Sequence, residues 1–507
     1  MSLTAADIER IVRTAEPNSS KPSPRSGELR ELLAMLGDYR FGPRRAPPLT
    51  MLCRAGVDHA WRKLKEENGA ALLAQLSPRA EASVKRHLQT TLQRITRPTL
   101  DLEWTSFTLA LSSLGFSGRE NSATAIQMFL RDRPSHRLER LFKRFPVLAH
   151  LWALAIGQWH NHIVEILRRT RKDRNALSRT FFKQNVASHI MSLRLGLSDP
   201  HHRGRSVSLI EFSRDHRLIY KPRSGRNELA WFSILEWMNR NGFQPKLRSM
   251  RVLVRKEYCW MEYARASPCA NLGAVRRFYE RLGGLIAVAY LLKAVDCHRE
   301  NLIAAGEHPV LVDADALWHV SPRTKTQSAG DVLYWTGFFP DARRRSLRSR
   351  SSVLGPGSRG THVPSLGGKP VQPGRYANEI ISGFTRAWRC LLSDPNRRAA
   401  FSRRLRQVRA RERRWIYSAT ARYAAILRAS VQPAALLSTA RRQAYLQRLC
   451  ARTGVTKTVV RAEIKALREL NIPYFNRRTG ERMPLERNHP PAELIQAIRQ
   501  ALEWPED

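Results

Sequence analysis

The segment AVDCHRENLIAAGEHPVLVDADAL concentrates residue types that could transfer a phosphoryl group from ATP. Such a reaction requires a carboxylate that orients or deprotonates the hydroxyl nucleophile, and oxygen ligands for Mg²⁺, often an Asn and an Asp. The apolar residues before the acidic positions predict a short β-hairpin that points the polar side chains into one cleft. Surface carboxylates beside a core histidine are the alternative. The candidate residues are Asp296, His298, Asn301, Asp313 and Asp315.

Lys221 could supply the cation that a phosphoryl-transfer site also needs. It ends the strand-like segment RLIYK, which is where kinases carry the lysine that contacts the ATP phosphates. The alternative is a strand-edge lysine that reaches solvent. Upstream, Asp199 and His201 precede Gly204 in a predicted turn. That turn could cover the phosphates, or it could be an ordinary polar turn.

The elements that must position these residues follow an α+β order. Helical spacing of apolar residues dominates from about 51 to 195. SVSLIEF and RLIYKP then predict a hairpin, NELAWFSILEWMNRNG a helix, RSMRVLVRKEYCWMEYA two strands, and VRRFYERLGGLIAVAYLLKAV a long buried helix. The hairpin that carries the acidic residues comes next.

Changes in composition divide the chain into five predicted regions. Its beginning is rich in Pro, Ser and Arg, which are loop signals. The later segment RRRSLRSRSSVLGPGSRG predicts either a flexible solvated loop or a mobile segment that faces the substrate. The regions are a flexible N-terminal segment at 1–50, a helical region at 51–195, a kinase-like core at 196–320, a flexible or activation segment at 321–375, and a helical C-terminal region at 376–507.

In the order of these motifs, the chain resembles the dehydratase domain of class II lanthipeptide synthetases, the LanM family. The resemblance is good over about 190–480 and faint over 50–190. The residues that carry it are Asp199, His201 and Gly204, the segment from Tyr220 to Arg223, Trp260 and Glu262, Tyr279, Arg281 and Gly283, Asp296, His298 and Asn301, Asp313 and Asp315, Arg414, Thr420 and Tyr423, and the IPYF segment after Asn471.

The resemblance implies a lipid-kinase-like catalytic core embedded in additional helices, and a reaction in two stages that uses ATP and Mg²⁺. A Ser or Thr of a ribosomally made precursor peptide is phosphorylated, and the phosphate is then eliminated to leave dehydroalanine or dehydrobutyrine. By position, Lys221 would hold the ATP phosphates and Asp296 would act on the hydroxyl. The implied Mg²⁺ ligands are Asn301, Asp313 and Asp315, and the other implied kinase-site residues are Asp199, His201 and His298.

The resemblance also implies that Arg414 and Thr420 grip the phosphate leaving group during elimination. A guanidinium suits this role because it can bind a phosphate dianion through two hydrogen bonds. The segment RRWIYSATARY predicts a helix. Residues spaced as these two are would lie about 240° apart around it, at roughly 100° per residue. A helix end, a bend or the long Arg side chain would then have to bring the two groups together.

Departures from the family shape the remaining expectations. Asp315 stands where the family usually has Glu, which leaves its role open, and Asn471 stands in an Asp position. The zinc-binding Cys, Cys and His of the family's C-terminal cyclase have no counterpart in this sequence. We therefore expect a stand-alone dehydratase. Its expected partners are a precursor peptide, with leader and core, and a separate cyclase or other tailoring enzymes.

The basic charge of the chain is compatible with several partners. Lys and Arg total 87 and Asp and Glu total 43, which gives a net charge of +44. The basic residues are spread along the chain without a nucleic-acid-binding motif, so we expect an acidic peptide or a phosphorylated substrate and no specific nucleic acid. Without an apolar run of membrane length or a signal peptide, we expect a cytoplasmic protein that makes no membrane contact. The scattered cysteines predict reduced, buried thiols.

Two other functions stay open from the sequence. One is a peptide kinase that lacks elimination, against which the pair of Arg414 and Thr420 argues. The other is a non-catalytic basic protein that binds peptide or nucleic acid. The intact set of Asp296, Asn301, Asp313 and Lys221 argues against it.

Overall fold

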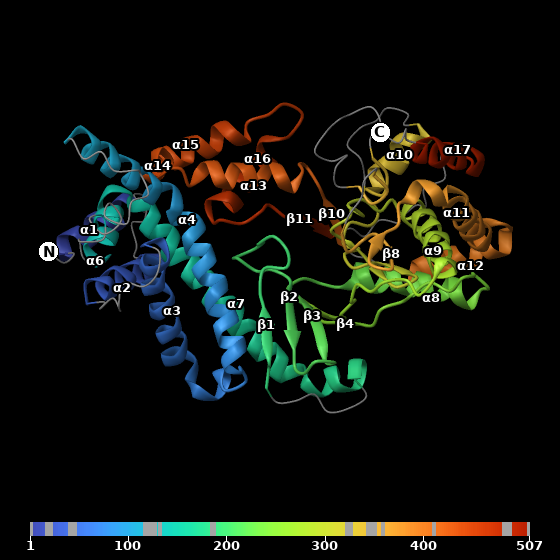
Figure 1. The fold of residues 1–507 in the computed structure, drawn as a ribbon, viewed down its shortest axis with the longest axis horizontal. Coiled ribbons are helices and arrows are strands. Elements are labelled where there is room, and N and C mark those ends of the chain that lie inside the picture. The colour runs from blue at the N-terminus through green and yellow to red at the C-terminus, as the bar shows by residue number, and fades with distance from the viewer. Residues whose placement is uncertain are drawn as a thin grey trace. The chain divides into compact units, whose positions relative to one another are not determined.

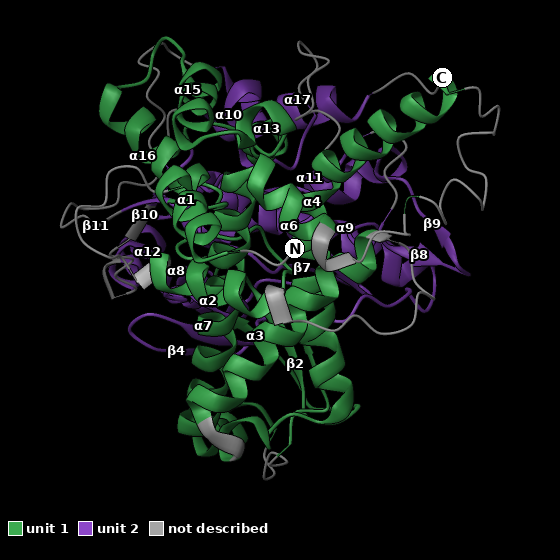
Figure 2. Ribbon diagram, turned by 90° about the vertical axis from the view of Figure 1, so that its left-hand side faces the viewer, with its two compact units in different colours: residues 1–220, 417–474 green, residues 221–416, 475–507 purple. Residues whose placement is uncertain are grey.

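The computed structural model describes residues 4–15, 24–38, 48–114, 129, 134–182, 189–319, 328–340, 352–355, 360–407, 412–478 and 489–503 (Figure 1). The chain divides into two compact units, which Figure 2 shows in different colours. Unit 1 contains residues 1–220 and 417–474, and unit 2 contains residues 221–416 and 475–507.

The N-terminal part of unit 1 is a group of helices around one buried helix. The central helix is α7 (Pro146–Leu177), which is apolar over most of its length and ends in a π-helical turn at Ser178–Phe182. Prolines begin most of these helices, because the first turn of a helix does not need the missing N–H. The helices packed on α7 are α1 (Ala5–Ala15), α2 (Pro24–Asp38), α3 (Pro48–Leu73), α4 (Pro78–Ser113) and α6 (Pro134–Arg144).

The first 50 residues contain helices where we expected a flexible segment. Helix α1 is amphipathic and buries Ile11, Val12 and Ala15. Helix α2 buries a leucine stripe at helical spacing, and this stripe outweighs the loop-forming prolines and serines around it. Its buried leucines are Leu29, Leu32, Leu33 and Leu36.

The C-terminal part of unit 1 is a second helical group. It contains α13 (Thr420–Ser430), α14 (Pro433–Leu436), α15 (Thr439–Cys450) and α16 (Lys457–Arg468). Its core consists of Tyr423, Ile426, Leu446, Cys450, Ile464, Leu467 and Ile472. The buried Arg442 of α15 donates hydrogen bonds to the carbonyl oxygens of Leu467 and Arg468, at 3.1 and 2.8 Å. It thereby satisfies carbonyl groups at the end of α16 that lack an intrahelical partner.

Three antiparallel strands complete unit 1. They are β1 (Ser192–Arg194), β2 (Ser208–Glu211) and β3 (Arg217–Lys221), with Leu193 opposite Ile210 and Ser208 opposite Tyr220. The hairpin predicted from SVSLIEF and RLIYKP is confirmed. Strand β3 runs to the boundary of the unit, because its last residue, Lys221, is the first residue of unit 2.

Unit 2 mixes helices with short antiparallel strand pairs. The pairs are β4 with β5, β6 with β7, β8 with β9 and β10 with β11. Helices with antiparallel strands make the fold α+β, as predicted. The elements are α8 (Arg226–Arg240), β4 (Val252–Val254), β5 (Cys259–Glu262), α9 (Leu272–Leu291), β6 (Leu302–Ala305), β7 (His308–Leu311), α10 (Ala329–Thr336), β8 (Ser365–Leu366), β9 (Lys369–Pro370), a 3₁₀ turn (Pro373–Tyr376), α11 (Ala377–Leu392), α12 (Pro395–Gln407), β10 (Glu412–Trp415), β11 (Phe475–Arg478) and α17 (Pro491–Leu502).

Helix α9 is the main support of unit 2, and it packs closely against α11. A Cβ atom on Gly283 would lie 1.9 Å from the carbonyl oxygen of Ile380, and one on Gly383 would lie 1.8 Å from that of Glu280. Only glycine at both positions lets the backbones approach this closely. Beside Gly283, the buried Arg281 donates to the carboxylate of Glu307 at 2.9 Å. The Tyr-x-Arg-x-Gly motif therefore fixes α9, whose end leads to Asp296.

Two expectations for the second half of the chain need correction. Arg414 lies on strand β10, opposite Asn476 of β11, and not on a helix with Thr420, which begins α13. Pairing with a strand distant in sequence supplies the hydrogen bonds that a helix would otherwise make. Within the segment expected to be flexible at 321–375, α10, β8 and β9 are regular elements. Residues 320–327, 341–351 and 356–359 lie outside the described residues.

The cysteines agree with the expectation of reduced, buried thiols. All six cysteines fall within the described ranges, are buried and form no disulfide, as predicted. Among the described helices, none combines the length and apolar composition that crossing a membrane requires.

Candidate functional site

The β6–β7 hairpin brings Asn301 and Asp313 to the same end of two strands. Leu302 lies opposite Leu311, and the N–H of Val312 donates to the carbonyl oxygen of Asn301 at 2.8 Å. Gly306, at φ +63°, allows the tight turn at the other end. The predicted hairpin is therefore confirmed. It places the amide residue Asn301 and the carboxylate residue Asp313 at the same end of the strand pair.

Lys221 is buried, and its ammonium group donates hydrogen bonds to three oxygen atoms. Its Nζ donates to Glu228 Oε1 at 2.9 Å, to the carbonyl oxygen of Val312 at 2.7 Å, and to Asp313 Oδ1 at 3.3 Å. Burial alone would lower the pKa of Lys221, but the carboxylates of Asp313 and Glu228 outweigh it and raise that pKa. The ammonium therefore stays charged inside the unit.

Arg223 reinforces this arrangement two residues further along the chain. Its Nη2 donates to Asp313 Oδ1 and lies 2.7 Å from Glu228 Oε1. Burial would raise the pKa of Asp313, but the charges of Arg223 and Lys221 outweigh it and hold that pKa well below its usual range. Two cations thus share two carboxylates, and all four groups stay ionised.

Asp296 sits in a constrained turn after α9. Its φ of +68° lies in the left-handed region, which few residues other than glycine occupy, although Asp tolerates it. The Nδ2 of Asn301 donates to the carbonyl oxygen of Asp296 at 2.8 Å and closes this turn. On the side chain, His298 Nε2 lies 3.3 Å from Asp296 Oδ1. The sequence motif Asp-x-His-x-x-Asn is therefore one local hydrogen-bonded unit.

The pKa shifts of Asp296 and His298 favour a carboxylate paired with an imidazolium. Burial raises the pKa of Asp296, but the hydrogen bond from His298 and the charge of Arg414 outweigh it and lower that pKa. Burial would lower the pKa of His298, but the contact with Asp296 raises it. An ionised carboxylate at this position could orient a hydroxyl group or accept its proton.

Arg414 reaches this carboxylate from strand β10. Its Nη1 donates to both carboxylate oxygens of Asp315, at 2.9 and 3.0 Å, and to Asp296 Oδ2 at 3.4 Å. Asp315 is only 4% exposed, and burial raises its pKa. The structure thus brings Arg414, predicted for elimination, next to Asp296, predicted for phosphorylation.

The predicted magnesium ligands fit the ion in part. The amide nitrogen of Asn301 is held by Asp296, and its amide oxygen has the chemistry that Mg²⁺ prefers, as has the carboxylate of Asp313. Within the described ranges, no cluster of three or more His, Cys, Asp or Glu side chains could hold a metal. Mg²⁺ at this pair would therefore need phosphate oxygens and water to complete its six ligands.

Three predicted residues lie in unit 1 and the others in unit 2. Thr420 is the first residue of α13. Asp199 and His201 lie in a turn where His202, Arg203 and Gly204 all have positive φ. The turn is held by the chain after α16: Gly204 N–H donates to Asn471 Oδ1 at 2.7 Å, and His201 Nδ1 lies 2.8 Å from the carbonyl oxygen of Ile472. That these residues join the site in unit 2 stays a prediction.

Glu228 is the site residue that the sequence argument missed. It lies in the first turn of α8 and its side chain is fully buried against Lys221. A signal was present, because kinases pair the phosphate-binding lysine with a helical glutamate, and Glu228 is in the first helix after the lysine. The sequence indicates Arg223 only as part of a motif, because its contact with Asp313 forms only when the hairpin is folded.

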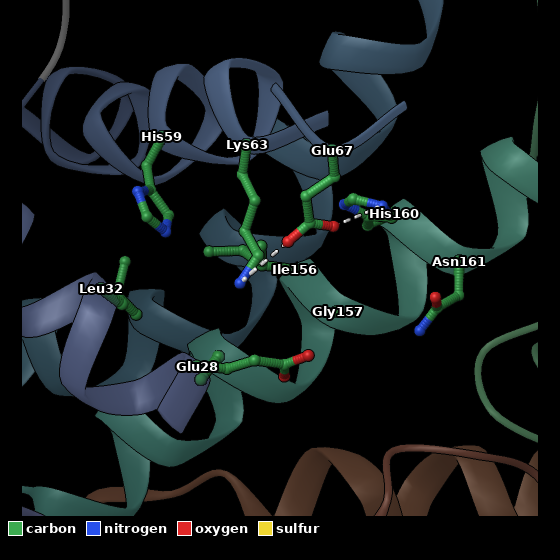
Figure 3. Close-up of a pocket in the computed structure, with 10 residues that line it drawn as sticks. Glu28, Leu32, His59, Lys63, Glu67, Ile156, Gly157, His160 and Asn161 are labelled. Carbon is green, nitrogen blue, oxygen red and sulfur yellow. Dashed lines mark ion pairs between the residues drawn. The ribbon is translucent and has the colours of Figure 1, made fainter. Parts of the chain in front are cut away.

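A separate pocket of about 90 Å³ lies within unit 1 among α2, α3 and α7 (Figure 3). Its lysine, Lys63, forms ion pairs with Glu31 at 2.5 Å and Glu67 at 3.6 Å. Burial lowers the pKa values of its histidines, His59 and His160. With its lysine held by carboxylates and its histidines neutral, this pocket is poorly suited to phosphate. It contains none of the predicted site residues.

Comparison with known proteins agrees with the motif order. The family described as "Domain of unknown function (DUF4135)" matches residues 145–361 and 350–478. The chain is also 24% identical over 392 residues to a protein of Lactococcus lactis subsp. lactis named lacticin 481/lactococcin biosynthesis protein LcnDR2. This match covers 67% of the chain and 41% of the relative, so the chain corresponds to less than half of that protein. Both findings support the resemblance to class II lanthipeptide synthetases.

Proposed function

The chain belongs to the DUF4135 family, and from this premise we propose that it dehydrates Ser and Thr residues of a ribosomally made precursor peptide, using ATP and Mg²⁺. The name of the lactococcal relative, a lacticin 481/lactococcin biosynthesis protein, favours a peptide substrate. The proposal includes a lipid-kinase-like core around the described site and a separate cyclase as a later partner. Because the reaction consumes ATP, we place it in the cytoplasm.

The observation that carries the proposal is the buried ammonium of Lys221 between Glu228 and Asp313. Holding a charged lysine at 2% exposure is costly unless its partners are well placed. An arrangement of a strand lysine, a helix glutamate and an aspartate after a hairpin is the one that kinases use around ATP phosphates. A purely structural lysine would not need a second cation, Arg223, beside the same two carboxylates.

In the first step, the side chains of the site would position ATP and the peptide hydroxyl. Lys221 and Arg223 would balance the charge of the phosphate oxygens. Asp296 would orient the hydroxyl and accept its proton as the oxygen attacks phosphorus and the bond to ADP breaks. Asn301 and Asp313 would hold Mg²⁺, which neutralises charge on the phosphates when bound.

In the second step, the phosphate leaves the peptide. A general base, either water or a basic side chain, takes the Cα proton, the electron pair of the Cα–H bond forms the Cα–Cβ double bond, and the Cβ–O bond breaks with its electrons going to phosphate. Arg414 would bind this dianion, because a guanidinium forms strong, directional hydrogen bonds to phosphate. The distance of 3.4 Å from Arg414 to Asp296 fits a single site in which both steps take place.

The test is incubation of the protein with ATP, MgCl₂ and short peptides encoded beside its gene, read by mass spectrometry. We expect peptide products lighter by one water for each modified residue. Lys221→Ala should return unmodified peptide, and Lys256→Ala is a control that changes a lysine of the β4–β5 connection. A product that only gains phosphate would establish a peptide kinase instead, and unmodified peptide with every neighbouring sequence would refute the proposal.

A further inference from the structure

We infer that Asp315 is a positioning residue that anchors Arg414, and that it is not a magnesium ligand. This inference rests on the proposed function for its catalytic consequence, but its structural content concerns only these side chains. It changes the expected role of the second acid in the Asp-x-Asp pair. Asp313 then faces the phosphate-binding cations, and Asp315 serves the residue that would hold the leaving phosphate.

The geometry at Asp315 is that of an arginine anchor. Both carboxylate oxygens accept from Nη1 of Arg414, at 2.9 and 3.0 Å, and Nε of Arg223 lies 3.7 Å from Oδ2. Asn227 donates to the carbonyl oxygen of Asp315 at 2.7 Å, which fixes its backbone. Arg414 therefore holds the side chain of Asp315, and Asn227 holds its backbone.

A metal ion would be poorly accommodated at the same carboxylate. The side chain of Asp315 is 5% exposed, which leaves little room for the water molecules that Mg²⁺ usually retains. Both oxygens of the Asp315 carboxylate accept from Arg414, whereas Lys221 and Arg223 contact the Asp313 carboxylate through its Oδ1 atom. Asp313 differs because its side chain is 24% exposed, and so remains accessible to an ion and to phosphate oxygens.

Anchoring matters because Arg414 comes from a short strand. Within the described residues, β10 spans Glu412–Trp415 and pairs with β11 in a two-stranded sheet. A long arginine side chain on such a strand has many conformations, and fixing it in advance reduces the entropy lost when it binds a phosphate. Asp315 holds the guanidinium beside Asp296, where the phosphorylated side chain would lie after the first step.

The first test asks where a divalent ion binds, and it needs no peptide. Mn²⁺, used with a non-hydrolysable ATP analogue and followed by electron paramagnetic resonance, is the probe. We expect Asp313→Asn to weaken Mn²⁺ binding by about 10- to 100-fold, and Asp315→Asn to leave it within about threefold of the unchanged protein. Equal loss in the two variants would overturn the inference.

The second test asks whether Asp315 holds Arg414. Modification of Arg414 by phenylglyoxal, measured by peptide mapping, should be several-fold faster in Asp315→Asn than in the unchanged protein. Asp313→Asn is the matched control and should leave the rate unchanged, and Asp315→Glu should restore slow labelling. If Asp315→Asn fails to fold, Asp315→Glu is compared with the unchanged protein instead. Fast labelling of Arg414 in Asp315→Glu would contradict the role of Asp315 as an anchor.

The third test separates this inference from the proposed function. If the unchanged protein dehydrates a precursor peptide, Asp315→Asn should accumulate phosphopeptide as Arg414→Ala does, and the double variant should be no worse than either single one. Unmodified peptide from Asp315→Asn would overturn the positioning role. If the unchanged protein modifies no peptide, the proposed function fails, and the labelling and Mn²⁺ results still decide whether Asp315 is an arginine anchor.

Discussion

The carboxylate of Glu228 lies 2.9 Å from the ammonium of Lys221, and both side chains are buried. The glutamate comes from the first turn of α8 and the lysine from the end of β3. Because the carboxylate also contacts Arg223, it balances two cations at once. The position of α8 therefore fixes where both cations lie, and in the proposed function these cations would contact the phosphates.

Replacement of Glu228 tests this relationship. In Glu228→Gln, Lys221 keeps Asp313 and the carbonyl oxygen of Val312 but loses one charged partner. We expect peptide phosphorylation to fall by about 10²- to 10³-fold, the usual effect of removing one electrostatic group from an active site. Glu236→Gln is the matched control on the same helix, because Glu236 is half exposed and pairs only with surface groups.

Product yields from mass spectrometry, with thermal unfolding as a check on the fold, decide the outcome. Activity within threefold of the unchanged protein would show that Glu228 has no role at the phosphate site. A similar loss in the Glu236 control would indicate general damage to α8.

The candidate site was predictable where its residues lie close together in the sequence. Asp296, His298 and Asn301 form one hydrogen-bonded turn, and the alternating apolar residues after Asn301 predict the hairpin that carries Asp313. The buried helix α9 was predictable as well, because apolar residues occupy all of its faces in its second half. These features depend on neighbours within a few residues, which is the information that periodicity contains.

Features that depend on distant partners were not predictable in the same way. Arg414 was expected on a helix, but β10 exists because β11 pairs with it, and the two strands are far apart in sequence. Glu228 was missed because helical spacing does not indicate that its carboxylate faces a lysine on a strand. The contact between Asn471 and Gly204 likewise joins two distant segments.

Asn471 should be needed to hold the turn at Gly204. Asn471→Ala removes the acceptor of the Gly204 N–H and also the donor to the carbonyl oxygen of Glu469. We expect a loss of about 1–3 kcal/mol in the free energy of unfolding, since two hydrogen bonds are lost and each contributes about 0.5–1.5 kcal/mol. Urea denaturation measures it. Asn471→Asp keeps the oxygen that accepts from Gly204, so it should lose less than half as much stability as Asn471→Ala does. Equal losses in Asn471→Ala and Asn471→Asp would contradict the role of the acceptor.

Thr420 should affect elimination without affecting phosphorylation. We expect Thr420→Ala to accumulate phosphopeptide, because the proposed grip on the leaving phosphate is weakened while Lys221 and Asp296 are untouched. Thr420→Ser should restore dehydration. Thr439→Ala is the control, since Thr439 also begins a helix but bonds the carbonyl oxygens of α1. Unmodified peptide from a folded Thr420→Ala protein would place Thr420 in peptide binding or in the kinase step.

The pair of His298 and Asp296 should make stability depend on pH. The folded-state pKa of His298 is raised above its ordinary 6.5, so the folded protein holds a proton that the unfolded chain releases. Its contribution is fully present below about pH 6.5 and is lost as the pH rises through the raised pKa. We expect the stability difference between the unchanged protein and His298→Gln to shrink as the pH rises above about 6.5. Urea titrations at each pH measure it, and a difference that grows with pH would contradict the pairing.

The most direct test of the central claim is transfer of radiolabelled γ-phosphate from ATP to the precursor peptide by Arg414→Ala. This variant should retain the phosphorylation step and trap its product, so the account predicts label on the peptide. Adding Asp296→Asn or Asp313→Asn to Arg414→Ala should abolish the label while the protein stays folded. Label that persists undiminished in both double variants, or dehydrated peptide formed by Asp296→Asn and Asp313→Asn at the unchanged rate, would contradict the assignment of this site to phosphoryl transfer.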